Sequence, residues 1–174
     1  MPTSPLLRSG ATLALTLAAL CAQAAPSHLV SSQKLPWQVA QQLAAEAVQT
    51  CAAKGWSVTA TVVDPSGHAQ AVIKGDTVPL QSLSVSYRKA YTAFSYGQAF
   101  DKDTISELLA AKLDGPANGA LNTVPQVLFI PGGVTLRKAD RQVLGGLGVS
   151  GAPGGDKDEG CALAAVKKFQ PQFE

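Results

Sequence analysis

The feature that most limits the fold of this chain is a short apolar segment near its start. Arg8 precedes an uncharged apolar run at residues 11–20, and a small-residue triplet follows at 22–24. This order is typical of a cleavable secretory signal, and about ten apolar residues are too few for a bilayer-spanning helix, which needs about twenty. We predict a signal peptide at residues 1–24, with cleavage near Ala24. The 150 residues that remain suit one domain with one core.

Charge and cysteine content narrow the class of protein. The formal net charge of +2 falls to +1 once Arg8 is removed, and the charges are spread along the chain, which argues against nucleic-acid and membrane-surface partners. Export places the mature chain in the periplasm or outside the cell. In that oxidising setting Cys51 and Cys161 are expected to form a disulfide; the alternative is that both are buried thiols that never meet.

Hydrophobic periodicity predicts an α/β domain of the α+β type, in which helices pack on an antiparallel sheet. Residues 25–34 are expected to be a flexible N-terminus and residues 35–174 a single domain. A capping box, formed by Asp156 and Glu159, is expected at the start of the last helix. The expected elements are a helix at 37–53, a hairpin of strands at 57–63 and 69–73, helices at 80–94 and 104–113, strands at 127–130, 134–137 and 142–149, and a helix from 156.

The last predicted strand is unusually rich in glycine, at Gly145, Gly146 and Gly148. Glycine weakens a strand, so its concentration indicates that another backbone, a helix or a ligand lies close against it.

Several short motifs, in order along the chain, resemble the GlcG/HbpS family of small haem-binding or haem-degradation-associated proteins, and also the C-terminal part of PduO-type proteins. The resemblance implies a profilin-like or Roadblock-like sandwich around a five-stranded antiparallel sheet, assembly into homo-oligomers, and haem or a related tetrapyrrole as the ligand. Residues 74–78 depart from the family pattern, which puts a ligand contact there in doubt. The matching motifs are Val62-Val63-Asp64 with Gly67-His68, Ser84 with residues 88–93, Pro131-Gly132-Gly133, residues 146–152, and Asp158-Glu159 with Cys161-Ala162.

Two histidines are the candidate ligands of a haem iron. His68 begins the second hairpin strand, where alternation places it on the face of Gln70 and Lys74; the alternative is an exposed turn histidine. His28 lies in the expected flexible N-terminus, from which it could reach a bound haem. The only methionine is Met1, and the sequence holds no Cys-x-x-Cys-His motif. Haem would therefore bind non-covalently, without methionine ligation in the mature chain.

Other candidate contacts come from the most amphipathic predicted helix and from the glycine-rich segments. Arg88 or Lys89 would neutralise the haem propionates while Tyr91 stacks or ligates; the alternative is core packing with solvated basic side chains. The remaining candidate cofactor contacts are Gly132, Gly133, Gly148 and Ser150.

These features predict an exported haem-binding protein that acts as a sensor, carrier or scavenger. The sequence contains no Gly-x-Ser-x-Gly elbow and no close cysteine pair, so an enzyme is the weaker interpretation and no catalytic residue is assigned. Two alternatives stay open. One is an accessory protein that binds a small organic acid or a corrinoid, and the other is a structural module that oligomerises.

Overall fold

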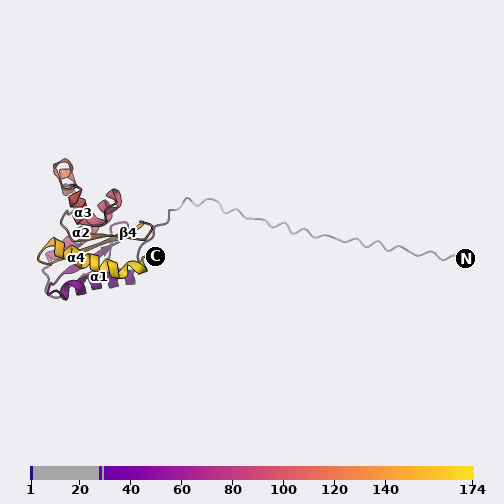
Figure 1. The fold of residues 1–174 in the computed structure, drawn as a ribbon, viewed down its shortest axis with the longest axis horizontal. Helices are drawn as coiled ribbons and strands as arrows, with labels where there is room; N and C mark the ends of the chain where they lie inside the picture. Colours follow the sequence, from indigo (N-terminus) through magenta and orange to yellow (C-terminus); the bar gives the residue numbers. More distant parts are fainter. Residues whose placement is uncertain (2–27, 29) are drawn as a thin grey trace. The chain divides into compact units, whose positions relative to one another are not determined.

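An antiparallel sheet of four strands organises residues Ser32–Glu174 (Figure 1). The computed structural model describes Met1, His28 and residues 30–174, so the predicted signal peptide beyond Met1 lies outside the described residues. The strands pair in the order β2-β1-β4-β3, and each neighbouring pair is antiparallel. The predicted hairpin is therefore confirmed as β1–β2. The strands are β1 (Thr59–Val63), β2 (Ala69–Lys74), β3 (Gly133–Arg137) and β4 (Val143–Ser150).

Helices pack on both faces of this sheet, which confirms the α+β class. On one face lie α1 (Trp37–Ala52) and α4 (Gly155–Phe169), and on the other lies α2 (Gln81–Phe100). After α2 come α3 (Ile105–Ala110) and the 3-10 helix η1 (Pro116–Thr123), and η2 (Gln170–Gln172) follows α4. None of the described helices is both long and apolar enough to cross a membrane.

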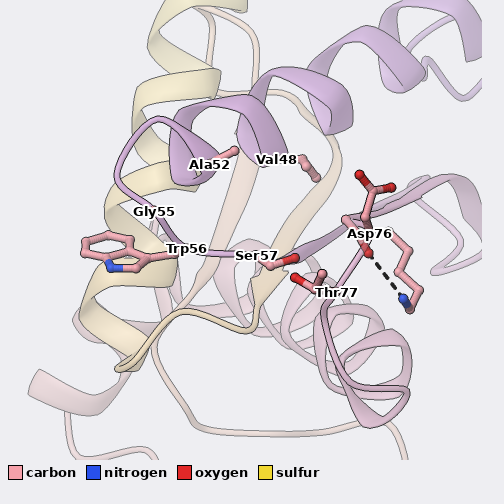
Figure 2. Close-up of a pocket in the computed structure, with 9 residues that line it drawn as sticks. Val48, Ala52, Gly55, Trp56, Ser57, Asp76 and Thr77 are labelled. Atoms are coloured by element: carbon pink, nitrogen blue, oxygen red, sulfur yellow. Dashed lines mark hydrogen bonds between the residues drawn. The ribbon is translucent and has the colours of Figure 1, made fainter.

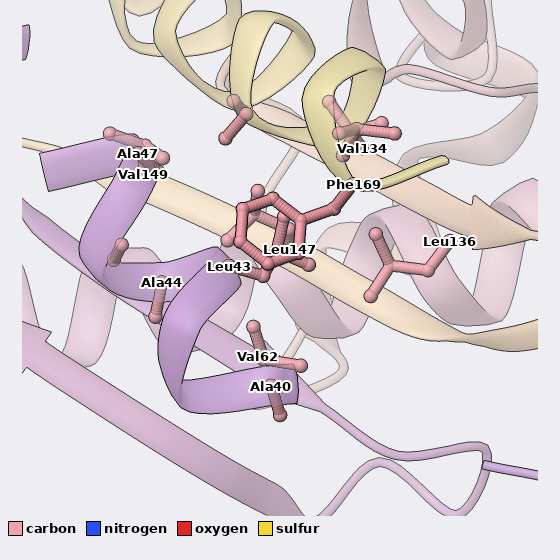
Figure 3. Close-up of a cluster of buried hydrophobic side chains, with 14 of the residues drawn as sticks. Ala40, Leu43, Ala44, Ala47, Val62, Val134, Leu136, Leu147, Val149 and Phe169 are labelled. Atoms are coloured by element: carbon pink, nitrogen blue, oxygen red, sulfur yellow. The ribbon is translucent and has the colours of Figure 1, made fainter. Parts of the chain in front are cut away.

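The main hydrophobic core lies between the sheet and the α1–α4 pair (Figure 3). Alternate strand residues point into it, as the period of two in a strand requires. Cys51 of α1 and Cys161 of α4 are fully buried and form a disulfide, with an S–S distance of 2.08 Å. The bridge ties together the two helices that cover this face. Core residues labelled in Figure 3 include Leu43, Ala44, Ala47, Val62, Leu136, Leu147, Val149 and Phe169.

Helix α2 packs unusually closely on the opposite face because the strands there carry glycine and small polar residues. A Cβ atom on Gly148 would collide with the carbonyl oxygen of Ser86, and one on Gly146 with that of Ala90. The hydroxyls of Thr61 and Ser86 are hydrogen-bonded at 2.8 Å across the interface. The glycine-rich strand was expected to have another backbone, a helix or a ligand close against it, and the structure shows that this neighbour is the helix α2.

Replacing Gly148 with alanine is expected to lower the free energy of unfolding by about 1–3 kcal/mol, because the added methyl group overpacks the α2–β4 contact. Urea unfolding measures the change. The matched control is Gly160→Ala in α4, where nothing lies within 4 Å of the added Cβ and alanine is the better helix former by about 1 kcal/mol. Equal stability of the two variants would contradict the close packing of α2.

The predicted strand at 127–130 does not form, so the expected five-stranded sheet is wrong. The Val127 carbonyl accepts a hydrogen bond from Arg88 Nη2 at 2.7 Å, and the Leu128 N–H donates to Thr92 Oγ1 at 2.7 Å. Two side chains of α2 therefore take backbone groups that a strand would offer to a neighbour. The short apolar run is therefore an irregular segment, in which Val127 is buried and Ile130 is 45% exposed.

The predicted capping box at the start of α4 is also wrong. The helix begins at Gly155, and its N-cap residue, Gly154, makes no side-chain cap. The Glu159 carboxylate instead accepts the N–H of Gly132 at 2.9 Å and that of Ser106 at 3.3 Å. Glu159 thus joins α4 to the segment that enters β3 and to α3.

Candidate ligand-binding site

The turn between β1 and β2 presents His68 at the surface. Asp64, which is largely buried, holds this turn, since its Oδ1 accepts the N–H of Ser66 at 2.9 Å and that of His68 at 3.1 Å. Lys34 Nζ donates to the other carboxylate oxygen at 3.2 Å. The His68 side chain is 84% exposed, so the imidazole is open to a ligand.

The Asp64 carboxylate also sets the electrostatics at His68. Burial raises the pKa of Asp64, but hydrogen bonds from Ser66, His68 and Lys34 outweigh that effect and hold the pKa below its ordinary value. The group is therefore ionised at neutral pH, with Oδ1 3.9 Å from His68 Nδ1. At this distance the two atoms are too far apart for a hydrogen bond, so the carboxylate contributes only its negative charge beside the ring. The exposed imidazole of His68 is therefore a single candidate nitrogen ligand.

Aromatic side chains of α2 lie against the same turn. The Tyr87 hydroxyl donates to the Gly67 carbonyl at 3.1 Å. Gly67 has a φ of +81°, and a Cβ there would lie 2.8 Å from Cε2 of Tyr91, so glycine is what lets the Tyr91 ring approach. We call Asp64, Gly67, His68, Tyr87 and Tyr91 the turn site; it brings two of the predicted ligand residues, His68 and Tyr91, to one region.

The predicted alternation of His68, Gln70 and Lys74 on one face is wrong because β2 contains a bulge. Val62 pairs with Ala71 and Val63 with Ala69, which leaves Gln70 as an extra residue. Its Nε2 donates to the Leu35 carbonyl at 2.9 Å, in the α1-side core. Lys74 lies opposite Thr59, whose hydroxyl is hydrogen-bonded to that of Ser82 in α2. Gln70 therefore faces α1 and Lys74 faces α2, so they lie on different faces of the sheet.

Arg88 and Lys89 are both engaged inside the domain. Arg88 is half-buried and donates to Val127, and its buried Nε has no partner among the described residues. Lys89 is only 2% exposed, and its Nζ donates to Asp158 Oδ2 at 2.7 Å and to the Val149 carbonyl at 3.0 Å. The alternative of solvated basic side chains therefore does not describe Lys89. Its predicted contact with propionates stays a prediction, and it would require this ion pair to open.

The predicted glycine contacts lie in the same tightly packed interior. Gly132 has a φ of +126°, and a Cβ there would lie 2.7 Å from Lys89 Nζ. A Cβ on Gly133 would collide with the Lys89 carbonyl, and Ser150 is buried at the end of β4. In the structure these glycines, like Gly148, admit α2 and Lys89 to the sheet, and their contact with a ligand stays a prediction.

The sequence did not predict the buried ion pair of Lys89 and Asp158, although both residues belong to the motifs described above. Lys89 follows Arg88 in an amphipathic helix, and Asp158 lies in the first turn of α4, where an acid ordinarily interacts with the helix dipole. The available signal was that Lys89 shares a helix face with the small residues Ser86 and Ala93, a face that can pack closely. Its partner, 69 residues away, could not be read from the sequence.

The second predicted histidine, His28, belongs to the N-terminal unit Met1–Ser31, which is separate from the domain, and it is exposed. Its role as a ligand therefore stays a prediction.

A hollow of about 440 Å³ lies at the opposite end of the β1–β2 hairpin from the turn site (Figure 2). It is formed by the end of α1, the start of β1 and the segment that follows β2. Part of it is the segment at 74–78 in which a ligand contact was doubted. Its lining residues are Val48, Ala52, Gly55, Trp56, Ser57, Lys74, Gly75, Asp76 and Thr77.

The sheet with helices on both faces defines a small α+β domain, which presents one histidine, His68, at a surface turn. A family model described as haem degrading protein HbpS-like matches residues 35–167. The chain therefore belongs to the HbpS-like family, as its sequence motifs predicted. A search of curated proteins finds no match.

Solved structures show the same fold. A double mutant of HbpS from Streptomyces reticuli is 34% identical, with a TM-score of 0.74 and coverage of 87% of this chain and 98% of that one. Protein ORFY from Klebsiella pneumoniae is 25% identical, with a TM-score of 0.71 and coverage of 84% and 97%. PduOC, solved in complex with haem, is 24% identical with a TM-score of 0.65 and coverage of 77% and 94%, a likeness of fold alone.

Proposed function

We propose that this chain is an exported protein that binds haem or a related tetrapyrrole non-covalently and serves as a sensor, carrier or scavenger. Membership of the HbpS-like family carries the proposal, because the match spans nearly the whole domain. The PduOC complex supports it, since haem is bound there by a protein of this fold.

The residues at the turn site fit such a ligand. Haem iron accepts a neutral imidazole as an axial ligand, and His68 is the histidine that the domain presents at its surface. The Asp64 carboxylate would lie beside the ring, 3.9 Å from Nδ1, and the aromatic face of Tyr91 suits an apolar macrocycle. Haem would supply the iron chemistry, while the chain would hold and orient it.

Export and assembly complete the proposal. The signal pattern at 1–24 supports release into the periplasm or the medium, and the Cys51–Cys161 bridge supports the same because disulfides persist in oxidising compartments. Export would be supported by a chain in the extracytoplasmic fraction whose intact mass matches residues 25–174. An uncleaved chain in the cytoplasm would contradict it. We also propose that copies of this chain assemble into a homo-oligomer. Native mass spectrometry tests this by measuring the mass of the assembly.

Replacing His68 with alanine is expected to weaken hemin binding at least about tenfold, which corresponds to about 1.4 kcal/mol, and to shift the Soret band, because the nitrogen ligand is lost. Hemin titration followed by absorbance measures both. His28→Ala, titrated in parallel, tests the second candidate histidine, and a loss of affinity there as well would indicate ligation by both histidines. An unchanged spectrum and affinity in His68→Ala would exclude His68 as the iron ligand.

A further inference from the structure

The chain contains two asparagines, and both lie in the 3-10 helix η1. Asn118 is followed by Gly119, and Asn122 is followed by Thr123. The side-chain amide of an asparagine can be attacked by the main-chain nitrogen of the next residue. Glycine favours this attack because it has no Cβ to shield that nitrogen or to restrict the backbone angles. The helix therefore holds one reactive pair and a second asparagine that serves as its internal control.

The structure holds η1 loosely. None of its eight residues is buried, and none of them belongs to a hydrophobic cluster of the domain. In Figure 1 the chain after α3 projects away from the sheet. A segment without buried apolar contacts opens locally at a small cost in free energy, and so short a helix is marginal by itself. The backbone of η1 can therefore rearrange while the rest of the domain stays folded.

The side chain of Asn118 and the backbone of Gly119 are both accessible. Asn118 Nδ2 donates to the Lys112 carbonyl at 3.4 Å, which is longer than the usual limit of about 3.2 Å. Gly119 is exposed, and no atom beyond its own helix neighbours lies within 4 Å of an added Cβ. Thr123, by contrast, has a β-branched side chain beside the nitrogen that Asn122 would need. The geometry therefore favours reaction at Asn118.

We propose that Asn118 is a site of spontaneous deamidation in the folded chain, with water as the co-reactant. The main-chain nitrogen of Gly119 bonds to Cγ of Asn118, the Cγ–Nδ2 bond breaks, and the displaced amide nitrogen takes up the Gly119 N–H proton and leaves as ammonia. Water then opens either carbonyl of the resulting succinimide, and no group is oxidised or reduced. Opening gives an aspartyl or an isoaspartyl residue at this position.

Both products change the surface of η1. Each carries a carboxylate where the amide was neutral, so the net charge of the chain becomes more negative by one. In the isoaspartyl product the main chain runs through Cβ, and the extra backbone atom prevents the turn at Asn118 from closing as before. The reaction uses no residue of the turn site. It is therefore independent of the haem proposal, and His68→Ala is expected to react at the rate of the parent.

Peptide mapping of the folded chain tests the proposal. Residues 25–174, with the disulfide intact, are kept at neutral pH and about 37 °C for several weeks, and a sample digested at the start corrects for reaction during digestion. The tryptic peptide of residues 113–137 contains both asparagines. Fragment masses are expected to show a gain of about one dalton at Asn118 and none at Asn122. The rate is expected to lie within about tenfold of that in urea, because only η1 has to open.

Two variants serve as controls for this test. Gly119→Ala adds a Cβ that meets no neighbour, and alanine is the better helix former, so the variant is expected to fold as the parent does, which urea unfolding checks. Its Cβ is expected to slow the gain at Asn118 at least about tenfold. Asn118→Gln, which would have to close a larger ring, is expected to show no gain. The proposal would be overturned by an unchanged Asn118 in the folded parent, by an equal gain at Asn122, or by a Gly119→Ala variant that reacts as fast as the parent.

Discussion

Replacing Lys89 with alanine is expected to lower the free energy of unfolding by about 3–5 kcal/mol, the usual cost of removing one partner of a buried ion pair. The Lys89 and Asp158 side chains are 2% and 4% exposed, and their charged atoms lie 2.7 Å apart. The variant leaves the Asp158 carboxylate buried, with the Ala152 N–H as its remaining hydrogen-bond partner among the described residues. Urea unfolding of the variant and the parent measures the loss.

The control for this variant is an exposed pair of the same type. Lys168 Nζ also lies 2.7 Å from its partner, Glu46, but the lysine is 63% exposed. Lys168→Ala is therefore expected to cost no more than about 1 kcal/mol. The double variant Lys89→Met with Asp158→Leu removes both charges and is expected to recover part of the loss. Similar losses in Lys89→Ala and Lys168→Ala would contradict the account of the buried pair.

The loss in Lys89→Ala is expected to depend on pH. Burial raises the pKa of Asp158 above its ordinary value, and Lys89 opposes that rise, so the pKa climbs further when Lys89 is removed. The folded variant then holds a proton that the unfolded chain has released. Its stability consequently falls as pH rises above the unfolded-state value of about 4. The deficit should be smaller at pH 4 than at pH 7, and an equal deficit would exclude an electrostatic cause.

Removing the Cys51–Cys161 bridge is expected to destabilise the domain by about 2–5 kcal/mol, because the bridge closes a long loop in the unfolded chain. The two cysteines are 110 residues apart. Cys51→Ala, Cys161→Ala and the double variant should lose stability equally within about 1 kcal/mol, since each removes the same bridge. Reduction of the parent should raise its intact mass by about two daltons. An unchanged unfolding midpoint in the variants would contradict the role of the bridge.

Much of the fold could be predicted because its signals are local. The helices α1 and α2 follow apolar periodicity, and Asp64 to Gly67 form the turn of the first hairpin. The glycines of β4 indicated a close neighbour, which is α2. The disulfide was one of the two alternatives for Cys51 and Cys161, and the structure contains it.

The parts that could not be predicted depend on partners distant in the sequence. The segment 127–130 reads as a strand, but Arg88 and Thr92 occupy its backbone groups. Glu159 has the spacing of a capping box, but it binds Gly132 instead. One bulged residue, Gln70, shifts the alternation of β2 and hence the set of side chains expected beside His68. In each case a tertiary contact overrides a local pattern.

The most direct test of the haem-binding proposal is a hemin titration of residues 25–174 with the disulfide intact. The account predicts a Soret shift that saturates at a fixed ratio of haem to chain and is lost or moved in His68→Ala. A titration that shows neither a Soret shift nor saturation, on protein that unfolds cooperatively in urea, would contradict it.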